Sequence, residues 1–331
     1  MIKRKLPENS NNVNNDFCDF LMELAEYEKN VSRNIYKFNA YRKAASTLAS
    51  HPVRIKSGQE AKKLNGIGDK IASKLDEFIE TGQLEKVKKI REDNTNSIIN
   101  TLTRVSGIGP AKAKELIADG IETIEDLRKH TEKLNHHQII GLKYLEDFET
   151  KIPREEIEQI EVVMRSKISE LDSQFEIIIC GSYRRGKQES GDIDVLISHP
   201  SYTSHDTKSD NKLLENVVNV LKSCQLIVET ISLGSVKFMG ACRIAKRSRR
   251  LDIRLTPYDQ YFCAVLYFTG SDLFNKEMRA HALNNGFTLN EYTLRKIGST
   301  GVPGEPLLVT CEEDIFDYID YPYKKPEERN I

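Results

Sequence analysis

Two acidic segments carry the side chains of this sequence that are best suited to chemistry. Asp192 and Asp194 stand two residues apart, and Asp252 lies between Arg250 and Arg254 at the same spacing. Successive side chains of a β-strand point to opposite faces, so Asp192 and Asp194 share one face of a predicted strand. Asp252 shares a face with Arg250 and Arg254 for the same reason. We therefore expect three carboxylates to converge from adjacent strands.

Such a cluster needs cations, because like charges repel and hard oxygen ligands of this kind suit Mg²⁺. Two ions roughly 3.5–4 Å apart would clamp the attacking and leaving oxygens of an in-line phosphoryl displacement. The turn GSYRRG before the aspartates adds the hydroxyl of Ser182 and the charge of Arg185. A lone Asp-x-Asp also fits a polar strand edge, but that alternative explains neither the apolar flanks nor the third acidic strand.

A short pattern occurs twice in the first half of the chain, as LNGIGDKIA and VSGIGPAKA. Its glycines, Gly66, Gly68, Gly107 and Gly109, lack the Cβ that would keep a phosphate from the backbone, and the helix after each copy offers unpaired N–H groups. Glycines that serve only a helix–turn–helix connection are the alternative for a single copy. Two copies, each followed by lysine and alanine, favour a grip on a nucleic-acid backbone.

Lys70 and Lys74 lie four residues apart on the helix predicted after the first repeat. Neighbouring positive charges, with Lys37 and Arg42 on another predicted helix, make protonation of one amine harder. That amine could then attack an aldehyde. Lysines at this spacing more often form a solvated face or a phosphate-binding patch, so the residues alone leave both interpretations open.

Composition bounds the class of protein. The 331 residues include no apolar run long enough to cross a membrane, which indicates a soluble globular chain. Six widely spaced cysteines without a Cys-x-x-Cys pair favour reduced thiols in an intracellular protein and argue against a zinc site. Residues 1–91 carry a net charge of +6 and the remainder −7, so the basic end is the expected polyanion binder.

We expect a modular chain that opens with an Asn-rich disordered tail, residues 9–15. Apolar residues at helical spacing predict a helical domain up to about residue 91 and a second helical unit up to about residue 150. Short β-rich runs from residue 175 predict an α/β layer, followed by a helix and short mixed elements. The predicted helices cover residues 35–48, 70–80, 84–91, 213–221 and 261–268. The predicted fold class is multidomain, helical first and then α/β and α+β.

A Gly-Ser turn, an Asp-x-Asp pair and a third aspartate resemble nucleotidyltransferases in general. The segments YFTGSDLFN, RAHA and NEYT, which begin at residues 267, 279 and 290, resemble the X family of DNA polymerases, of the DNA polymerase beta type. The resemblance covers nearly the whole chain with both hairpins in order. It implies a tail at 1–13, a lyase domain at 14–91, a thumb at 92–150, a palm at 151–260 and fingers at 261–331, with one helix-hairpin-helix motif in each of the lyase domain and the thumb.

The resemblance assigns roles in the palm and fingers. Asp192, Asp194 and Asp252 would hold two Mg²⁺ ions, which Mn²⁺ can replace, with Arg185 and Arg254 in the same catalytic centre. Tyr267 and Phe268 would abut the sugar of the incoming nucleotide, Asp272 and Asn275 would flank its base, and Arg279 would touch the template. Residues implied to contact the rest of the dNTP are Lys151, Ser182, Arg185, Gly191, Asp192 and Gly270.

The resemblance also assigns roles near the N-terminus. Lys74 would form a Schiff base and remove a 5′-deoxyribose phosphate by β-elimination. Residues implied to support it or to bind DNA there are Lys37, Tyr41, Lys70 and Tyr36, of which Tyr36 would stack on a base at the 5′ side of the gap. The hairpin glycines would contact DNA. Each hairpin would hold Na⁺ or K⁺ through backbone carbonyls, those of Lys62, Leu64 and Ile67 and those of Thr103, Val105 and Ile108.

We therefore predict a template-directed repair polymerase for short gaps, with a lyase activity and no proofreading exonuclease. The alternatives are a non-catalytic DNA-binding scaffold, which the intact aspartates disfavour, and a template-independent terminal transferase, which the Tyr-Phe-Thr-Gly segment and the helical N-terminus disfavour. Expected partners are gapped or nicked DNA, dNTPs, and scaffold and ligase proteins of base excision repair. We expect a monomer in the nucleus, with the cytoplasm or mitochondrion as further locations, because Lys-Arg-Lys at 3–5 hints at nuclear import. The basic stretch 243–250 has no functional account beyond extra contact with phosphate.

Overall fold

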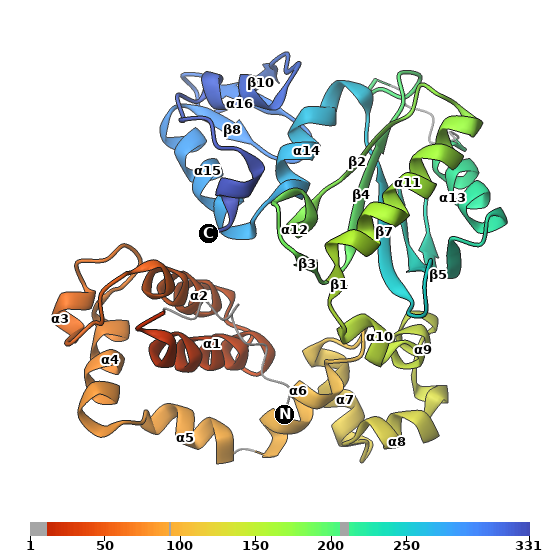
Figure 1. Ribbon diagram of the computed structural model, residues 1–331. Coiled ribbons are helices and arrows are strands. Elements are labelled where there is room, and N and C mark those ends of the chain that lie inside the picture. The colour runs from red at the N-terminus through yellow and green to blue at the C-terminus, as the bar shows by residue number, and fades with distance from the viewer. Residues whose placement is uncertain (1–11, 93, 206–211) are drawn as a thin grey trace. The chain divides into compact units, whose positions relative to one another are not determined.

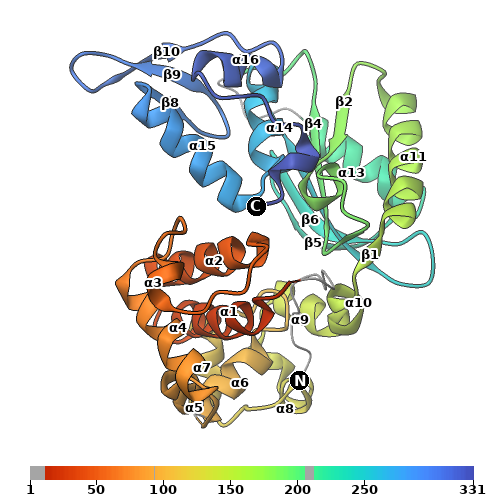
Figure 2. The same cartoon turned by 60° about the vertical axis from the view of Figure 1, so that its left-hand side comes forward.

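The computed structural model describes residues 12–92, 94–205 and 212–331, apart from the side chains of residues 92 and 94. The chain divides into two compact units, residues 1–138 and 139–331 (Figure 1, Figure 2). The predicted import segment at 3–5 and most of the predicted tail lie outside the described residues.

The first unit is helical throughout its described part, as predicted. The predicted helices at 35–48, 70–80 and 84–91 are confirmed with small differences at their ends. The division between the two units falls within α9. The helical elements up to residue 149, of which α10 belongs to the second unit, are in order α1 (Asn15–Asn30), α2 (Ile35–Ser50), α3 (Gly58–Ala61), α4 (Asp69–Thr81), α5 (Glu85–Glu92), α6 (Asn94–Leu102), α7 (Pro110–Ala118), α8 (Ile124–Lys129), the 3₁₀ turn Thr131–Lys133, α9 (His136–Lys143) and α10 (Leu145–Glu149).

Helix α1 holds the first domain together, because its apolar side chains recur at helical spacing and all face one core. Phe17, Phe20 and Leu24 are buried. The ring centroids of Phe17 and Phe20 lie 5.8 and 4.9 Å from that of Phe78 on α4. The aromatic contacts join the first helix to the helix that follows the first hairpin.

The expected disordered tail is wrong at its end. Asn14 is fully buried, and its side-chain amide donates to the carbonyls of Leu48 and Val53 at 3.3 and 3.0 Å. Its side-chain oxygen accepts from the N–H of Ile55 at 3.0 Å, and α1 begins at the next residue, Asn15. The amide is thus fully used in closing the loop after α2.

The second unit is built on a five-stranded sheet with the order β2-β4-β7-β6-β5. Strands β4 and β7 are parallel, and the other neighbouring pairs are antiparallel. A separate two-stranded pair joins β1 to β3. The elements are β1 (Ile152–Pro153), α11 (Arg154–Leu171), β2 (Glu176–Ile179), α12 (Gly181–Arg184), β3 (Glu189–Ser190), β4 (Ile193–Ser198), α13 (Leu213–Ser223), β5 (Ile227–Leu233), β6 (Lys237–Cys242) and β7 (Arg249–Leu255).

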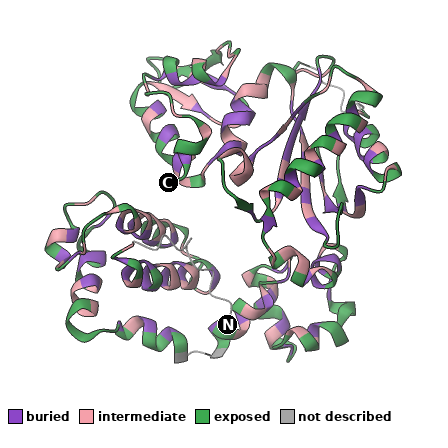
Figure 3. Ribbon diagram, in the orientation of Figure 1, coloured by how far each residue is buried: buried purple, intermediate pink, exposed green. Residues whose placement is uncertain are grey.

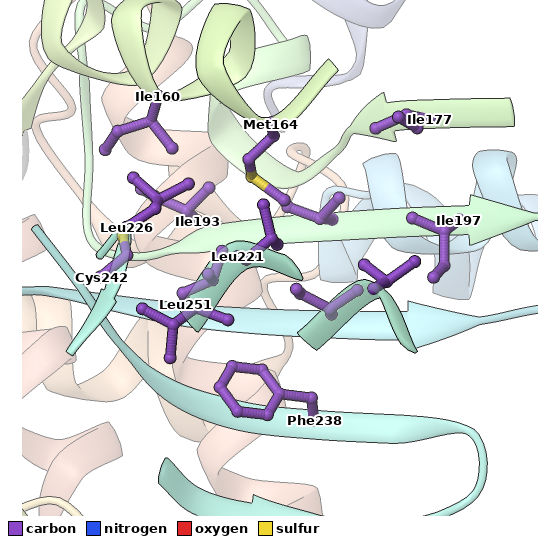
Figure 4. Close-up of a cluster of buried hydrophobic side chains, with 14 of the residues drawn as sticks. Ile160, Met164, Ile177, Ile193, Ile197, Leu221, Leu226, Phe238, Cys242 and Leu251 are labelled. Atoms are coloured by element: carbon purple, nitrogen blue, oxygen red, sulfur yellow. The ribbon is translucent and has the colours of Figure 1, made fainter. Parts of the chain in front are cut away.

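The two faces of this sheet differ. Helices α11 and α13 cover one face, where Met164, Ile193 and Leu251 belong to a single buried cluster (Figure 4). On the other face Leu196 packs against Val265 of α14. The central strands β4 and β7 are largely buried along their length (Figure 3). The packing of apolar side chains, rather than contacts of the polar ones, therefore determines which face of the sheet each side chain of β4 and β7 lies on.

A second, smaller core lies in the C-terminal part of the unit. Its buried side chains include Phe274, Leu294, Ile315 and Phe316. The elements are the 3₁₀ turn Tyr258–Gln260, α14 (Tyr261–Thr269), α15 (Asp272–Asn284), the three-stranded sheet of β8 (Phe287–Leu289), β9 (Leu294–Ile297) and β10 (Pro303–Pro306), α16 (Glu312–Tyr318) and the 3₁₀ turn Pro326–Arg329. The predicted fold class is confirmed.

Two predictions from composition can be compared with the fold. No helix in the described part of the chain is long and apolar enough to span a membrane. All six cysteines are free thiols, and Cys18, Cys180, Cys242 and Cys263 are buried. The buried cysteines serve as small apolar core residues, as expected.

We predict that Phe238→Ala destabilises the second unit by about 3–5 kcal/mol, because the fully buried ring leaves a cavity in the sheet core. Urea unfolding followed by circular dichroism measures the change. Val162→Ala is the matched control, because Val162 is 68% exposed and its truncation should change stability by less than about 0.5 kcal/mol. Equal effects of the two substitutions would contradict the placement of this core.

Candidate active site

The pairing of β4 with β7 sets the positions of the candidate catalytic carboxylates. In the parallel register Asp194 lies directly opposite Asp252. Ile193 and Val195 are buried toward α11 and α13, so Asp194 faces the other side of the sheet, as the alternation predicts. Asp252 is a strand residue of β7, as predicted, whereas Asp192, which was predicted to share a strand face with Asp194, lies one residue before β4.

Asp194 lies in a close-fitting, poorly solvated position. Gly181 has a φ of +59°, and a Cβ on it would lie only 2.8 Å from Asp194 Oδ2, so glycine is required there for shape and conformation. Burial, and next the charge of Asp252, raises the pKa of Asp194 to about 6. Lys237 and Arg185 oppose that rise. Burial and the charge of Asp252 thus disfavour the charged form of Asp194, which a bound cation would favour.

Asp192 lies one residue before β4, and its carboxylate accepts a hydrogen bond from Arg250. The Nε atom of Arg250 is also 3.9 Å from Asp252 Oδ1, so this guanidinium lies between two of the three carboxylates. In the described ranges no group of three His, Cys, Asp or Glu side chains is gathered closely enough to hold a metal ion. The donor chemistry of Asp192, Asp194 and Asp252 nevertheless fits Mg²⁺ or Mn²⁺, with Arg250 supplying positive charge in this structure.

Helix α12 brings two of the predicted phosphate contacts to the same edge of the sheet. The predicted Gly-Ser turn is a single helical turn, in which the Ser182 hydroxyl donates to the Ser190 hydroxyl at 2.9 Å. Arg185 follows directly, and Nη1 donates to the carbonyl of Thr269 at 2.6 Å. Burial lowers the pKa of the Arg185 guanidinium. A half-buried cation with spare N–H groups is a suitable anion site.

Lys151 and Gly191 complete this edge. A Cβ on Gly191 would lie 3.6 Å from the ammonium nitrogen of Lys151, and Gly191 directly precedes Asp192. The structure thus gathers these predicted nucleotide contacts around the first aspartate.

The predicted sugar and base contacts lie on α14 and α15. Tyr267, Asn275 and Arg279 line one hollow, and the Asn275 side chain donates to the carbonyl of Tyr267 at 2.7 Å. Phe268 points elsewhere and packs under the guanidinium of Arg254, 5.1 Å from the ring centroid. Tyr267, Asn275 and Arg279 thus lie together in the hollow. Phe268 lies apart from them, against Arg254 of β7.

Gly270 directly follows α14 and Asp272 begins α15, and neither lines that hollow. Gly270 has a φ of +65° and is joined to Ser271 by a cis peptide bond. A Cβ on Gly270 would lie 3.3 Å from Nη1 of Arg185. Asp272 is exposed, with its carboxylate 3.0 Å from the amine of Lys276.

The basic stretch 243–250 has a structural role that the sequence did not reveal. The N–H of Ser248 donates to Asp147 at 2.9 Å. Arg249 is buried, forms a two-pronged ion pair with Glu156 at 2.6 and 2.7 Å, and donates to the carbonyl of Thr150 at 3.1 Å. These contacts fasten the segment around Lys151 to the start of β7. No local pattern indicates them, because the partners are about a hundred residues apart.

The two hairpins share one backbone design. Gly66 and Gly107 have φ values of +84° and +90°, so both need glycine. Gly68 and Gly109 precede α4 and α7, and nothing lies within 4 Å of a Cβ built on either one. The first residues of both helices are therefore open to an incoming phosphate.

The carbonyl positions predicted to hold a monovalent cation also correspond. The N–H of Ile67 donates to the carbonyl of Leu64 at 3.4 Å, and that of Ile108 donates to the carbonyl of Val105 at 3.0 Å. The second loop has an additional anchor that the sequence did not indicate. The buried side chain of Gln138 donates to the carbonyl of Gly107 at 3.0 Å.

The predicted nucleophile Lys74 lies half-buried on α4, where its amine donates to the carbonyl of Lys70 at 3.1 Å. Burial lowers the pKa of Lys74, followed in effect by Lys86, while Glu77 opposes and Lys37 and Lys70 add to the decrease. The predicted lysine cluster is thus brought together, and Lys86 of α5 joins it. Sequence spacing gave no sign of Lys86.

A buried carboxylate lies beside this cluster. Glu28 of α1 is 1% exposed and lies 2.7 Å from the amine of Lys86 and 3.7 Å from that of Lys37. Burial raises the pKa of the neighbouring Tyr41. Tyr36, the predicted stacking residue, is 85% exposed. Glu28 was missed because a single glutamate in an amphipathic helix carries no sequence signal.

Comparison with known families follows this architecture along the chain. Residues 12–84 match a helix-hairpin-helix domain, and residues 100–149 match the fingers domain of DNA polymerase lambda. Residues 151–258 match the DNA polymerase beta palm, and residues 264–330 match the DNA polymerase beta thumb. The two domains that flank the palm in sequence therefore carry the reverse of the names given from sequence, which were thumb for 92–150 and fingers for 261–331.

Two curated relatives are similar to most of the chain. DNA polymerase lambda from Rattus norvegicus is 33% identical over 318 residues, which is 93% of this chain and 55% of the relative. DNA polymerase lambda from Arabidopsis thaliana is 33% identical over 308 residues, which is 88% of this chain and 58% of the relative. The chain spans a little over half the length of both relatives.

The sheet, its opposed aspartates and the matching palm together define a nucleotidyltransferase-type palm between helical and α+β domains. The consecutive matches and the relatives place the chain in the X family of DNA polymerases. The beta-type expectation holds for the palm and thumb matches, whereas both of these relatives are lambda enzymes.

We predict that Glu156→Ala destabilises the second unit by about 3–5 kcal/mol, because it leaves the buried guanidinium of Arg249 without its partner. Glu158→Ala on the same helix removes a more exposed pair with Arg154 and should cost less than about 1 kcal/mol. Urea unfolding of both variants measures the difference. A similarly small loss of stability in both variants would show that the Arg249–Glu156 pair does not hold these segments together.

Proposed function

We propose that this chain is a template-directed DNA polymerase that fills short gaps by transferring nucleotides from dNTPs to a primer 3′-hydroxyl. The observation that carries the proposal is the register that places Asp194 opposite Asp252, with Asp192 one residue before β4. The family and the lambda relatives support it. We propose the domain limits given from sequence, 14–91, 92–150, 151–260 and 261–331, for the four functional parts.

Asp192, Asp194 and Asp252 would hold the divalent ions. When bound, two Mg²⁺ or Mn²⁺ ions would supply neutralising charge and a lower pKa for the primer hydroxyl. Arg185 would neutralise charge on the triphosphate, because its guanidinium is half-buried and already oriented by Thr269.

The remaining palm and C-terminal residues would bind and select the nucleotide. Lys151, Ser182 and Gly191 would contact its phosphates, and Gly270 would lie beside Arg185. Tyr267 and Phe268 would disfavour a ribose, with Arg254 fixing the Phe268 ring. Asp272 and Asn275 would flank the base, and Arg279 would meet the template strand.

We further propose a 5′-deoxyribose-phosphate lyase in the first unit. The neutral amine of Lys74 would attack the sugar C1′ aldehyde and form an imine with loss of water. Loss of a C2′ proton would then expel the 3′ phosphate by β-elimination, and hydrolysis of the imine would free Lys74. The lowered pKa of Lys74 and the surrounding Lys37, Lys70 and Lys86 support this role. Tyr41 and the buried Glu28 would hold the cluster in place.

DNA binding would be shared by the hairpins and the basic N-terminal domain. The glycines of both hairpins would admit the backbone of a gapped or nicked duplex, and Na⁺ or K⁺ would bind at the loop carbonyls. The exposed ring of Tyr36 would stack at the 5′ side of the gap. Scaffold and ligase proteins of base excision repair and a nuclear location belong to the same proposal, as do a monomeric state and the absence of proofreading.

A DNA-binding scaffold and a template-independent terminal transferase are the competing functions. The presence of all three aspartates disfavours the scaffold, because the repulsion between Asp194 and Asp252 favours a bound cation. Incorporation that ignores the template base would favour the terminal transferase. Release of a mismatched 3′ nucleotide would contradict the absence of proofreading.

We predict that the two activities separate by substitution. On a one-nucleotide-gapped duplex with Mg²⁺ and all four dNTPs, the wild type adds the templated nucleotide and a chelator stops it. Asp252→Ala should lose synthesis by more than about a thousandfold, because it removes a metal ligand and its developing-charge stabilisation, yet keep lyase activity. Lys74→Ala should do the reverse.

Each variant is the control for the other in that experiment, because both are tested on the same gapped DNA. Loss of both activities in either single variant would contradict two separate sites. A wild-type chain that binds the gapped duplex and adds nothing would favour the scaffold.

We predict that borohydride trapping of the Schiff base rises with pH at values below about 10.4, the ordinary lysine pKa, because the pKa of Lys74 is lowered. Lys86→Ala should move this rise to higher pH, since it removes the neighbouring positive charge that disfavours protonation of Lys74. Lys88→Ala, an exposed lysine of the same helix, should leave the profile in place. An unmoved profile in Lys86→Ala would contradict the electrostatic role of Lys86.

A further inference from the structure

Asn330, in the segment 324–331, contacts Arg185 of the palm. Neither the sequence patterns nor the family resemblance assigned a role to Asn330. The side-chain oxygen of Asn330 accepts from Nε of Arg185 at 3.0 Å. Its side-chain nitrogen donates to the carbonyls of Arg185 and Glu327, both at 2.9 Å. Nε can only donate and a carbonyl can only accept, so the orientation of this amide is fixed by its partners.

Arg329, the residue before Asn330, is itself firmly held by its contacts. Arg329 is fully buried and donates to Glu312 at 2.7 Å and to the carbonyl of Lys324 at 2.8 and 3.0 Å. Its guanidinium also lies over the ring of Phe274, 5.6 Å from the centroid. A buried charge is stable only with such complete pairing, so the next residue is presented from a rigid position.

The contact orients one end of the Arg185 side chain and leaves the other free. Nε is held by Asn330 and Nη1 by the carbonyl of Thr269 at 2.6 Å. Within the parts of the chain that the structure describes, Nη2 has no hydrogen-bond partner. The planar guanidinium is thus fixed at two atoms, which leaves Nη2 available for a further partner.

We propose that Asn330 is a positioning residue that aims Arg185 at the triphosphate of the incoming nucleotide. The inference rests on the proposed polymerase function and deepens it. An arginine held in its binding rotamer loses less conformational freedom when the nucleotide arrives, so preorganisation appears as affinity. A residue that merely fastened the segment 324–331 would affect folding stability and would not depend on Arg185.

The test is steady-state incorporation on gapped DNA by the full chain carrying Asn330→Ala. We expect the KM for dNTP to rise about tenfold, the low end for loss of one hydrogen bond to a charged group, with kcat changed less than about threefold. Asn216→Ala, an exposed asparagine on α13, is the matched control and should match the wild type. Thermal unfolding of each variant should give unchanged midpoints.

A double-mutant cycle with Arg185→Ala separates aiming from fastening. The dNTP affinity is measured on gapped DNA with a dideoxy-terminated primer, so no turnover is needed. Asn330→Ala should weaken dNTP binding in the wild-type background and have no further effect in Arg185→Ala. If the Asn330→Ala variant folds poorly, the same measurement is made on Asn330→Ser, which is a more conservative substitution.

Equal losses in both backgrounds, or a lowered unfolding midpoint with an unchanged KM, would overturn the inference. An Asn330→Ala enzyme identical to an active wild type would overturn it alone. A wild type that adds no nucleotide would overturn the proposed function and this inference with it.

Discussion

The central constraint on the second unit is the opposition of two carboxylates, Asp194 and Asp252, on neighbouring parallel strands. The pairing of the two strands and the apolar packing of α11 and α13 against the other face hold these residues in place, although their charges repel. Nearby groups moderate the repulsion. Lys237 and Arg185 act through their charge, and Arg250 lies between Asp252 and the third carboxylate. The packed core of the palm thus keeps the carboxylates of Asp194 and Asp252 on neighbouring strands despite their repulsion.

In the first unit the clustered charges are positive rather than negative, and a residue of opposite charge again lies among them. Lys74 lies among positive neighbours, and the cluster is held by the almost inaccessible carboxylate of Glu28, which pairs with Lys86 and Lys37. In both units one group of opposite sign bridges a like-charged set, Arg250 among aspartates and Glu28 among lysines. Glu28 of α1 lies on a different element from Lys74 of α4, whereas Arg250 shares strand β7 with Asp252.

Much of this arrangement was predictable, because it depends on short-range pattern. Alternation along a strand placed Asp194 on the polar face, and the repeated Gly-x-Gly indicated the two hairpins. What failed or was missed depends on distant contacts. The Asn-rich composition favoured a tail, but the fully buried amide of Asn14 is bonded to carbonyls more than thirty residues away. Likewise the partners of Arg249 and Asn330 are separated from them by about 100 and 145 residues, beyond any local signal.

The topology of the sheet also has a consequence for the order in which the molecule becomes competent. Asp194 and Asp252 come from strands that are parallel and adjacent, yet α13 and two strands intervene along the chain. Closing so long a loop before any contact is gained is slow, and parallel pairing cannot be made by a hairpin. The register of β4 with β7 is therefore expected to form late in folding. A chain interrupted during synthesis or folding would then present the two hairpins before the opposed aspartates of the palm are in place.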